Sequence, residues 1–101
     1  MSGGRTKNSF IKDLVYEKYF VISFVFRTLT YVYVKPKDKQ NYTFIPLEIT
    51  KSKDLEEKFD IVKFPTEVAA NAVLKKIPSV DIGGYDVYLE IKPNTFLAEL
   101  L

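Results

Sequence analysis

The segment from Glu57 to Lys92 constrains the fold most, because its pattern changes from strand to helix and back to strand. Phe59 to Phe64 is a short apolar run bounded by charged and turn-forming residues, which predicts a strand. Thr66 to Ile77 repeats apolar residues at helical spacing and predicts a helix capped by Thr66. Tyr85 to Lys92 alternates apolar and polar residues after a glycine turn and predicts a second strand. This layout packs one helix on one face of a sheet.

The first half of the chain predicts a strand–turn–strand unit. Phe20 to Lys35 is rich in Phe, Val, Ile, Thr and Tyr, which favour strands. As one strand it would span roughly 53 Å, far more than a typical strand of about five or six residues. We therefore expect a break near Arg27-Thr28. A polar turn over residues 36–41 then leads to a strand from Tyr42 to Thr50, in which Pro46 marks an edge position or a bulge.

The two ends of the chain complete the predicted fold. Residues 1–7 form a Gly/Ser/Arg/Lys tail that we expect to be disordered, and residues 8–101 form a single domain. We expect a helix from Asn8 or Ser9 to about Tyr19, and a short amphipathic helix from Thr95 to Leu101. The predicted class is α+β: an antiparallel sheet of about four strands, one main helix on one face and short terminal helices.

Composition excludes several kinds of chemistry. The 101 residues include no cysteine and no histidine, which excludes disulfides, the common zinc sites, Ser-His-Asp triads and Cys-His pairs. We see no acid–base or nucleophile constellation, so we expect neither an enzyme nor a bound metal or cofactor. No signal peptide or apolar stretch long enough to cross a membrane is visible, which predicts an intracellular protein that is neither secreted nor membrane-bound.

Charge is distributed unevenly along the chain. Residues 1–53 contain ten Lys or Arg against four Asp or Glu, whereas residues 54–101 contain five against nine. The basic half hints at an anionic partner, although a set of solvated faces explains the same counts. Charge alone therefore leaves the question of a partner open.

Residues within 57–92 match part of a known strand signature. Phe59 takes the first aromatic position of the pattern Lys/Arg-Gly-aromatic-Gly/Ala-aromatic-Val-x-aromatic, and Val62 and Phe64 take its core positions. With the helix and strand that follow, the segment resembles the second half of an RNA recognition motif (RRM), so the fold is RRM/ferredoxin-like in part. Ile61 replaces the second stacking aromatic, and no helix is predicted within residues 20–50. The first half is thus divergent or rearranged.

The resemblance implies a small module that binds single-stranded RNA on an open sheet face. Aromatic side chains on such a face stack on bases, and basic side chains neutralise phosphates, so that binding depends strongly on salt. The candidate stacking residues are Tyr31, Tyr33, Phe59 and Tyr88. The candidate phosphate-binding residues are Arg27, Lys35, Lys63 and Lys92.

A second hypothesis belongs to another class of function. Apolar content is high for so short a chain, at 47%, and exposed sheet edges pair readily with other chains. The protein is then a non-enzymatic subunit of a larger complex, or a homodimer, which uses a sheet edge and the C-terminal helix. In that case self-association is insensitive to salt.

Overall fold

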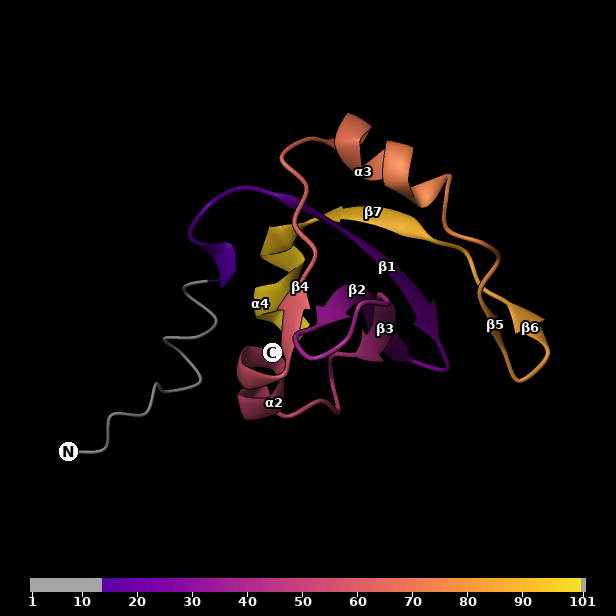
Figure 1. Cartoon of the computed structure of the whole chain (residues 1–101), viewed down its shortest axis with the longest axis horizontal. Coiled ribbons are helices and arrows are strands. Elements are labelled where there is room, and N and C mark those ends of the chain that lie inside the picture. The colour runs from indigo at the N-terminus through magenta and orange to yellow at the C-terminus, as the bar shows by residue number, and fades with distance from the viewer. Residues whose placement is uncertain (1–13, 101) are drawn as a thin grey trace.

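A five-stranded antiparallel sheet organises residues 14–100, the part of the chain that the computed structural model describes (Figure 1). Its main path runs in the order β3-β2-β1-β7, and β4 pairs with β2. The strands are β1 (Phe20–Phe26), β2 (Leu29–Pro36), β3 (Thr43–Pro46), β4 (Phe59–Ile61) and β7 (Glu90–Pro93). The predicted α+β class is confirmed, with one strand more than expected in the sheet. The predicted tail and most of the predicted N-terminal helix lie outside the described residues.

The long apolar stretch breaks where its length predicted. β1 and β2 form a hairpin in which Phe26 pairs with Leu29 across a two-residue turn. The turn residues Arg27 and Thr28 have φ values of 50° and 68°. Two successive positive φ angles match the right-handed twist of the flanking strands, which explains how the chain reverses here without glycine.

β1 and β2 pair with each other only near their turn, and farther from it each pairs with the segment 59–64. β1 and β2 pair from Ser23–Val32 as far as the turn, while β4 pairs with the last part of β2. Further along, Phe64 bridges Phe20 through two backbone hydrogen bonds of 2.8 and 2.9 Å. Since Phe20 also pairs with Pro93 of β7, Phe64 and β7 lie on opposite sides of β1. The connection between them contains α3 (Glu67–Leu74) and the segment of residues 81–86.

Helix α3 begins as predicted and ends early. The Thr66 hydroxyl accepts a hydrogen bond of 3.1 Å from the Ala69 N–H, which confirms the predicted N-cap. The helix ends at Leu74 rather than Ile77. Tighter i→i−3 bonds follow it, from Lys76 N–H to Val73 O and from Ile77 N–H to Leu74 O. Pro78 comes next and cannot donate to a further helical turn.

The strand predicted from Tyr85 to Lys92 is wrong over its first half. Tyr85–Asp86 is β6, which pairs with β5 (Asp81–Ile82) in a separate two-stranded ribbon, and β7 begins only at Glu90. Gly83 and Gly84 have φ values of 61° and 88°, so the predicted glycine turn folds the chain back on itself at once. The expected strand from Tyr42 to Thr50 is likewise shorter, because residues 47–49 form a turn.

Helices cover both faces of the sheet. On one face, α2 (Ser52–Glu57), the 3-10 helix η1 (Asn94–Phe96) and α4 (Leu97–Leu100) enclose a core that includes Val21, Val32, Leu55 and Leu97. On the other face, α3 packs chiefly over β1 and β7 (Figure 1). The predicted C-terminal helix is therefore folded onto the sheet. The predicted N-terminal helix is wrong at its end, since residues 16–19 are not helical.

Candidate functional site

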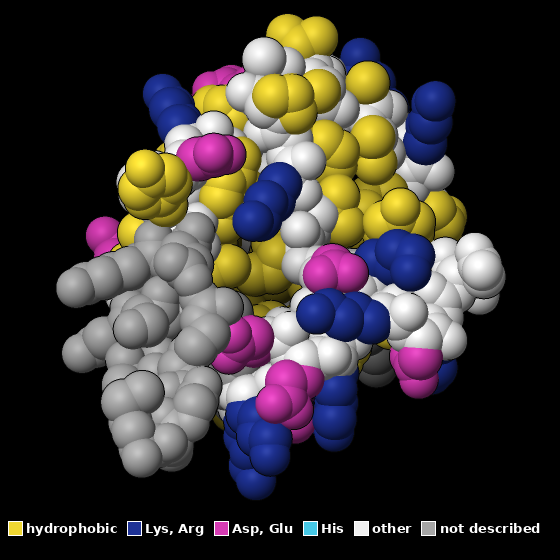
Figure 2. Space-filling model, turned by 60° about the vertical axis from the view of Figure 1, so that its left-hand side comes forward, with side chains coloured by type: hydrophobic (Ala, Val, Ile, Leu, Met, Phe, Trp, Pro, Cys, Tyr) yellow, Lys and Arg dark blue, Asp and Glu magenta, His cyan; other side chains and the backbone are white. Residues whose placement is uncertain are grey.

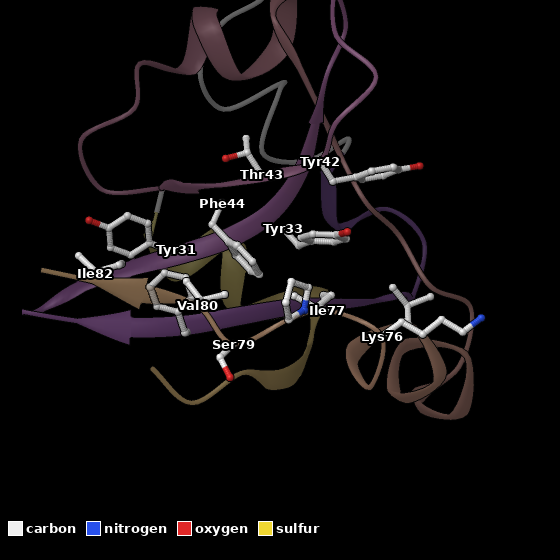
Figure 3. Close-up of a pocket in the computed structure, with 13 residues that line it drawn as sticks. Tyr31, Tyr33, Tyr42, Thr43, Phe44, Lys76, Ile77, Ser79, Val80 and Ile82 are labelled. Carbon is white, nitrogen blue, oxygen red and sulfur yellow. The ribbon is translucent and has the colours of Figure 1, made fainter. Parts of the chain in front are cut away.

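A groove lined by aromatic side chains lies on the α3 face of the sheet, over β2 and β3. Its volume is about 490 Å³. The floor is formed by side chains of β1, β2 and β3, and the wall by the end of α3 and the segment leading to β5 (Figure 3). We call this the aromatic groove; its aromatic residues are Phe24, Tyr31, Tyr33, Tyr42 and Phe44.

The floor rings form two stacked pairs with one ring between them. Phe24 and Tyr31 stack with centroids 4.6 Å apart, and Tyr33 and Tyr42 stack at 5.3 Å. Phe44 lies 5.0 Å from Phe24 and 5.1 Å from Tyr33. Strand alternation places Tyr31 and Tyr33 on the same face, and the register sets Phe44 opposite Tyr33. The result is a continuous aromatic surface at one side of the sheet.

The two ends of the groove differ in polarity. Tyr31 and Ile82 lie at one end, whereas Tyr42 and Lys76 lie near the other (Figure 3). Lys76 is the only charged residue among those lining the groove, and its ammonium group has no ion pair within the described residues. Burial, and to a smaller extent the neighbouring Tyr42, raises the pKa of Tyr33, so the ring stays neutral at ordinary pH. The groove thus offers aromatic ring faces, and at one end a lysine without an ion pair to residues 14–100.

Two of the eight predicted site residues line this groove, and two more lie on the same hairpin outside its lining. Tyr31 and Tyr33 line it directly. Lys35 follows on the same face of β2, where its Nζ donates a hydrogen bond of 3.2 Å to Pro36 O. Arg27 lies in the β1–β2 turn, with its guanidinium 5.4 Å from the Phe26 ring centroid.

The other four predicted site residues lie elsewhere. Phe59 is partly buried against the core on the face of α2 and α4, so it lies on the opposite face of the sheet from Tyr31 and Tyr33. Lys63 stands over the Tyr19 ring at 5.1 Å, and Lys92 forms an ion pair of 3.9 Å with Glu90. Tyr88 is 92% exposed in the connection between β6 and β7. The predicted residues therefore do not form a single platform.

Several residues that line the groove were missed from the sequence, among them Tyr42, Phe44 and Lys76. Tyr42 and Phe44 belong to the segment already predicted as a strand, where they alternate with Thr43 and Ile45. That alternation was a usable signal for two aromatics on one face. Lys76 carried no such signal, because only the packing of α3 brings its side chain to the groove.

The outer edge of β3 has few free backbone donors. Leu47 N–H donates to Thr30 O at 2.9 Å, so the next pair along, Tyr31 and Pro46, is not hydrogen-bonded. The backbone of Pro46 therefore faces outward, where it has no N–H to offer. Phe44 is left as the only outward donor within this strand.

The outer edge of β7 repeats this arrangement. Asn94 N–H donates to Tyr19 O at 2.9 Å, and the neighbouring pair, Phe20 and Pro93, is again not hydrogen-bonded. Pro93 faces outward, which leaves Ile91 as the only outward donor of β7. Proline at both edges limits the addition of a further strand from another chain.

The described residues hold no cluster suited to a metal ion, and the side of the molecule in Figure 2 shows no single dominant charge. No group of three or more acidic side chains in residues 14–100 is placed to hold a metal ion. Basic and acidic side chains are interspersed on the side of the molecule shown in Figure 2. None of the helices in the described part of the chain has the length and apolar character needed to span a bilayer.

No known protein family, no curated protein and no solved structure matches this chain. The resemblance to the second half of an RNA recognition motif stays a prediction.

Proposed function

We propose that this protein is a small non-enzymatic module that binds single-stranded nucleic acid, RNA foremost, in the aromatic groove. The observation that carries the proposal is the partly exposed aromatic floor, in which Tyr33 and Tyr42 stack at the end of the groove that Lys76 also lines. Stacking of a base on an aromatic ring contributes about 1–3 kcal/mol. In this proposal the binding surface is the part of the α3 face, over β2 and β3, that the helix does not cover.

The basic residues near the groove supply the contacts with phosphate. Lys76 lies at the groove and Lys35 follows Tyr33 on β2, while Arg27 lies at the far end of the hairpin. Each phosphate neutralised on a single strand adds about −0.7 to the slope of log affinity against log salt. With one or two such contacts, affinity falls only about three- to sevenfold between 50 and 200 mM salt. This dependence is weaker than the sequence alone predicts.

The alternative of a protein-interaction subunit draws less support from the structure. Its two predicted surfaces were a sheet edge and the C-terminal helix. Each edge strand has a proline facing outward, and Leu97 of α4 is fully buried against the sheet. Groove variants that leave a salt-insensitive self-association unchanged would favour this alternative.

The test measures the affinity of labelled single-stranded RNA for the full chain by fluorescence anisotropy. We expect Tyr42→Leu to weaken binding about 5- to 100-fold, in line with the loss of one stacked ring. Tyr42 is half exposed, so the change should leave the unfolding free energy within about 0.5 kcal/mol of the wild-type value. Phe59→Leu is the control on the opposite face: it should lower stability and leave the affinity of the folded protein unchanged.

A second pair of variants tests the charge at the groove. Lys76→Gln should weaken binding and make the salt dependence less steep, since one phosphate contact is lost. Lys75→Gln is the matched control, because Lys75 precedes it in the chain, is exposed, and does not line the groove. Equal effects of the two lysine variants, or no effect of Tyr42→Leu, would refute the proposed site.

A further inference from the structure

We infer, on the basis of the proposed function, that the groove recognises the faces of bases and not their edges. The protein should then bind single strands of any sequence, prefer purines through stronger stacking, and bind RNA and DNA alike. The argument rests on which polar groups line the groove and which do not.

Most kinds of side chain that read base edges are missing from the groove. Asn, Gln, Asp, Glu and Arg pair with the donors and acceptors of bases, and none of them lines the groove in the described part of the chain; Lys76 is the one charged lining residue there, and its ammonium suits a guanine edge alone. The polar groups that do line it are the hydroxyls of Thr43, Ser79 and the three tyrosines, and the Lys76 ammonium. Hydroxyls both donate and accept, so they distinguish one base from another poorly.

The backbone of the wall has few free donors. Lys76 N–H and Ile77 N–H are bonded within the last turn after α3, at 2.9 and 3.2 Å, and Pro78 has no N–H. Val80 O accepts a hydrogen bond of 3.1 Å from Val87 N–H. Two N–H groups of the wall are therefore engaged in the fold and Pro78 has none, which leaves the N–H groups of Ser79 and Val80 as the backbone donors of the wall with no backbone partner among the described residues.

Ring faces remain as the main source of binding free energy. Tyr42 stacks on Tyr33 and is half exposed, so a base can extend this stack. Every base has a π face, and the larger purine faces stack more strongly, which gives modest preferences without edge contacts. A groove of about 490 Å³ has the size of a small-ligand site. It suits one or two unstacked bases and not a duplex, in which the base faces already cover one another.

The experiment compares eight-nucleotide oligo(A), oligo(C), oligo(U) and oligo(dA), each titrated against the wild-type chain and four variants. We expect the order A, C, U to span no more than about tenfold, and oligo(dA) to bind within about threefold of oligo(A). Tyr42→Phe keeps the ring and should retain affinity and ranking, whereas Tyr42→Leu should weaken all four ligands together. Thr43→Val and Ser79→Ala should leave the ratios between ligands unchanged.

Two different failures can be told apart. A preference above about 100-fold for one base, or ratios that collapse in Thr43→Val or Ser79→Ala, would show edge readout and overturn this inference alone. No binding of any of the four ligands by the wild-type chain would overturn the proposed function, and the inference with it.

Discussion

The two faces of the sheet have similar alternating apolar residues but very different covers. On one face, α2, η1 and α4 close over the core, and Val21, Val32 and Leu97 are fully buried. On the other, α3 lies chiefly over β1 and β7, and the aromatic residues of β2 and β3 remain partly exposed. An apolar face thus becomes core or binding surface according to what covers it.

The buried side chain of Asn94 ties two segments together on the face covered by α2, η1 and α4, which we call the closed face. Among the described residues the α3 face, which we call the open face, has no buried polar side chain of this kind. Asn94 is 1% exposed; its Oδ1 accepts from Tyr19 N–H at 3.2 Å, and its Nδ2 donates to Leu14 O and Glu17 O. It holds the segment preceding β1 against the start of η1. If these hydrogen bonds hold the helices against this face, removing them should lower the unfolding free energy more than any other change proposed here.

We therefore expect Asn94→Ala to lower the unfolding free energy by about 3 kcal/mol, because two buried backbone groups and one part-buried group lose their partner. Urea denaturation of the variant and the wild type measures this change. Asn71→Ala is the control on the exposed side of α3 and should change stability by less than about 0.5 kcal/mol. A loss below about 1 kcal/mol for Asn94→Ala would mean that packing alone closes this face.

The pH dependence of stability provides a second comparison of the faces, because each face carries a tyrosine with a raised pKa. Burial raises the pKa of Tyr19, on the closed face, to about 12. The unfolded chain releases this proton near pH 10 and the folded chain only near pH 12. Stability should be fully present below pH 10 and fall by about 2 kcal/mol between pH 10 and 12, after allowance for solvent screening.

Stability measured by urea denaturation at several alkaline pH values checks this window. Tyr19→Phe should remove most of the pH dependence, and because the buried Tyr19 hydroxyl makes no hydrogen bond of good geometry to residues 14–100, the variant should lose little stability at neutral pH. Tyr33 on the open face, whose pKa burial also raises, contributes in the same direction. A Tyr33→Phe variant that removes more of the dependence than Tyr19→Phe would reverse the comparison between the faces.

The smallest change in unfolding free energy is expected at the β1–β2 turn, which connects two strands that contribute side chains to both faces of the sheet. Thr28 is β-branched and has a φ of 68°, a conformation that glycine adopts without strain. We expect Thr28→Gly to raise the unfolding free energy by about 1 kcal/mol, as the relief of strain exceeds the entropy that glycine adds to the unfolded chain. Thr28→Ala is the control and should bring no such gain, since alanine is also strained here. Thermal unfolding of the three proteins measures the difference.

Local signals in the sequence located the elements well where one residue type has a strong backbone preference. Thr66 caps α3, Pro46 lies in an edge strand, and Gly83-Gly84 forms a turn, all as predicted. The break at Arg27-Thr28 followed from the length of the apolar stretch. The candidate site was predicted less well: Tyr31 and Tyr33 line the groove, but Phe59 lies on the opposite face.

The sequence by itself determined the α+β class, the main helix and the alternation that makes each strand two-faced, because these depend on propensities and periods within a few residues. Only the tertiary structure decided which face each aromatic occupies and which face stays open. Alternation states that Tyr31 and Tyr33 share a side, but the pairing register and the position of α3 determine what lies over them. Those contacts join residues far apart in the chain, and a local pattern carries no information about them.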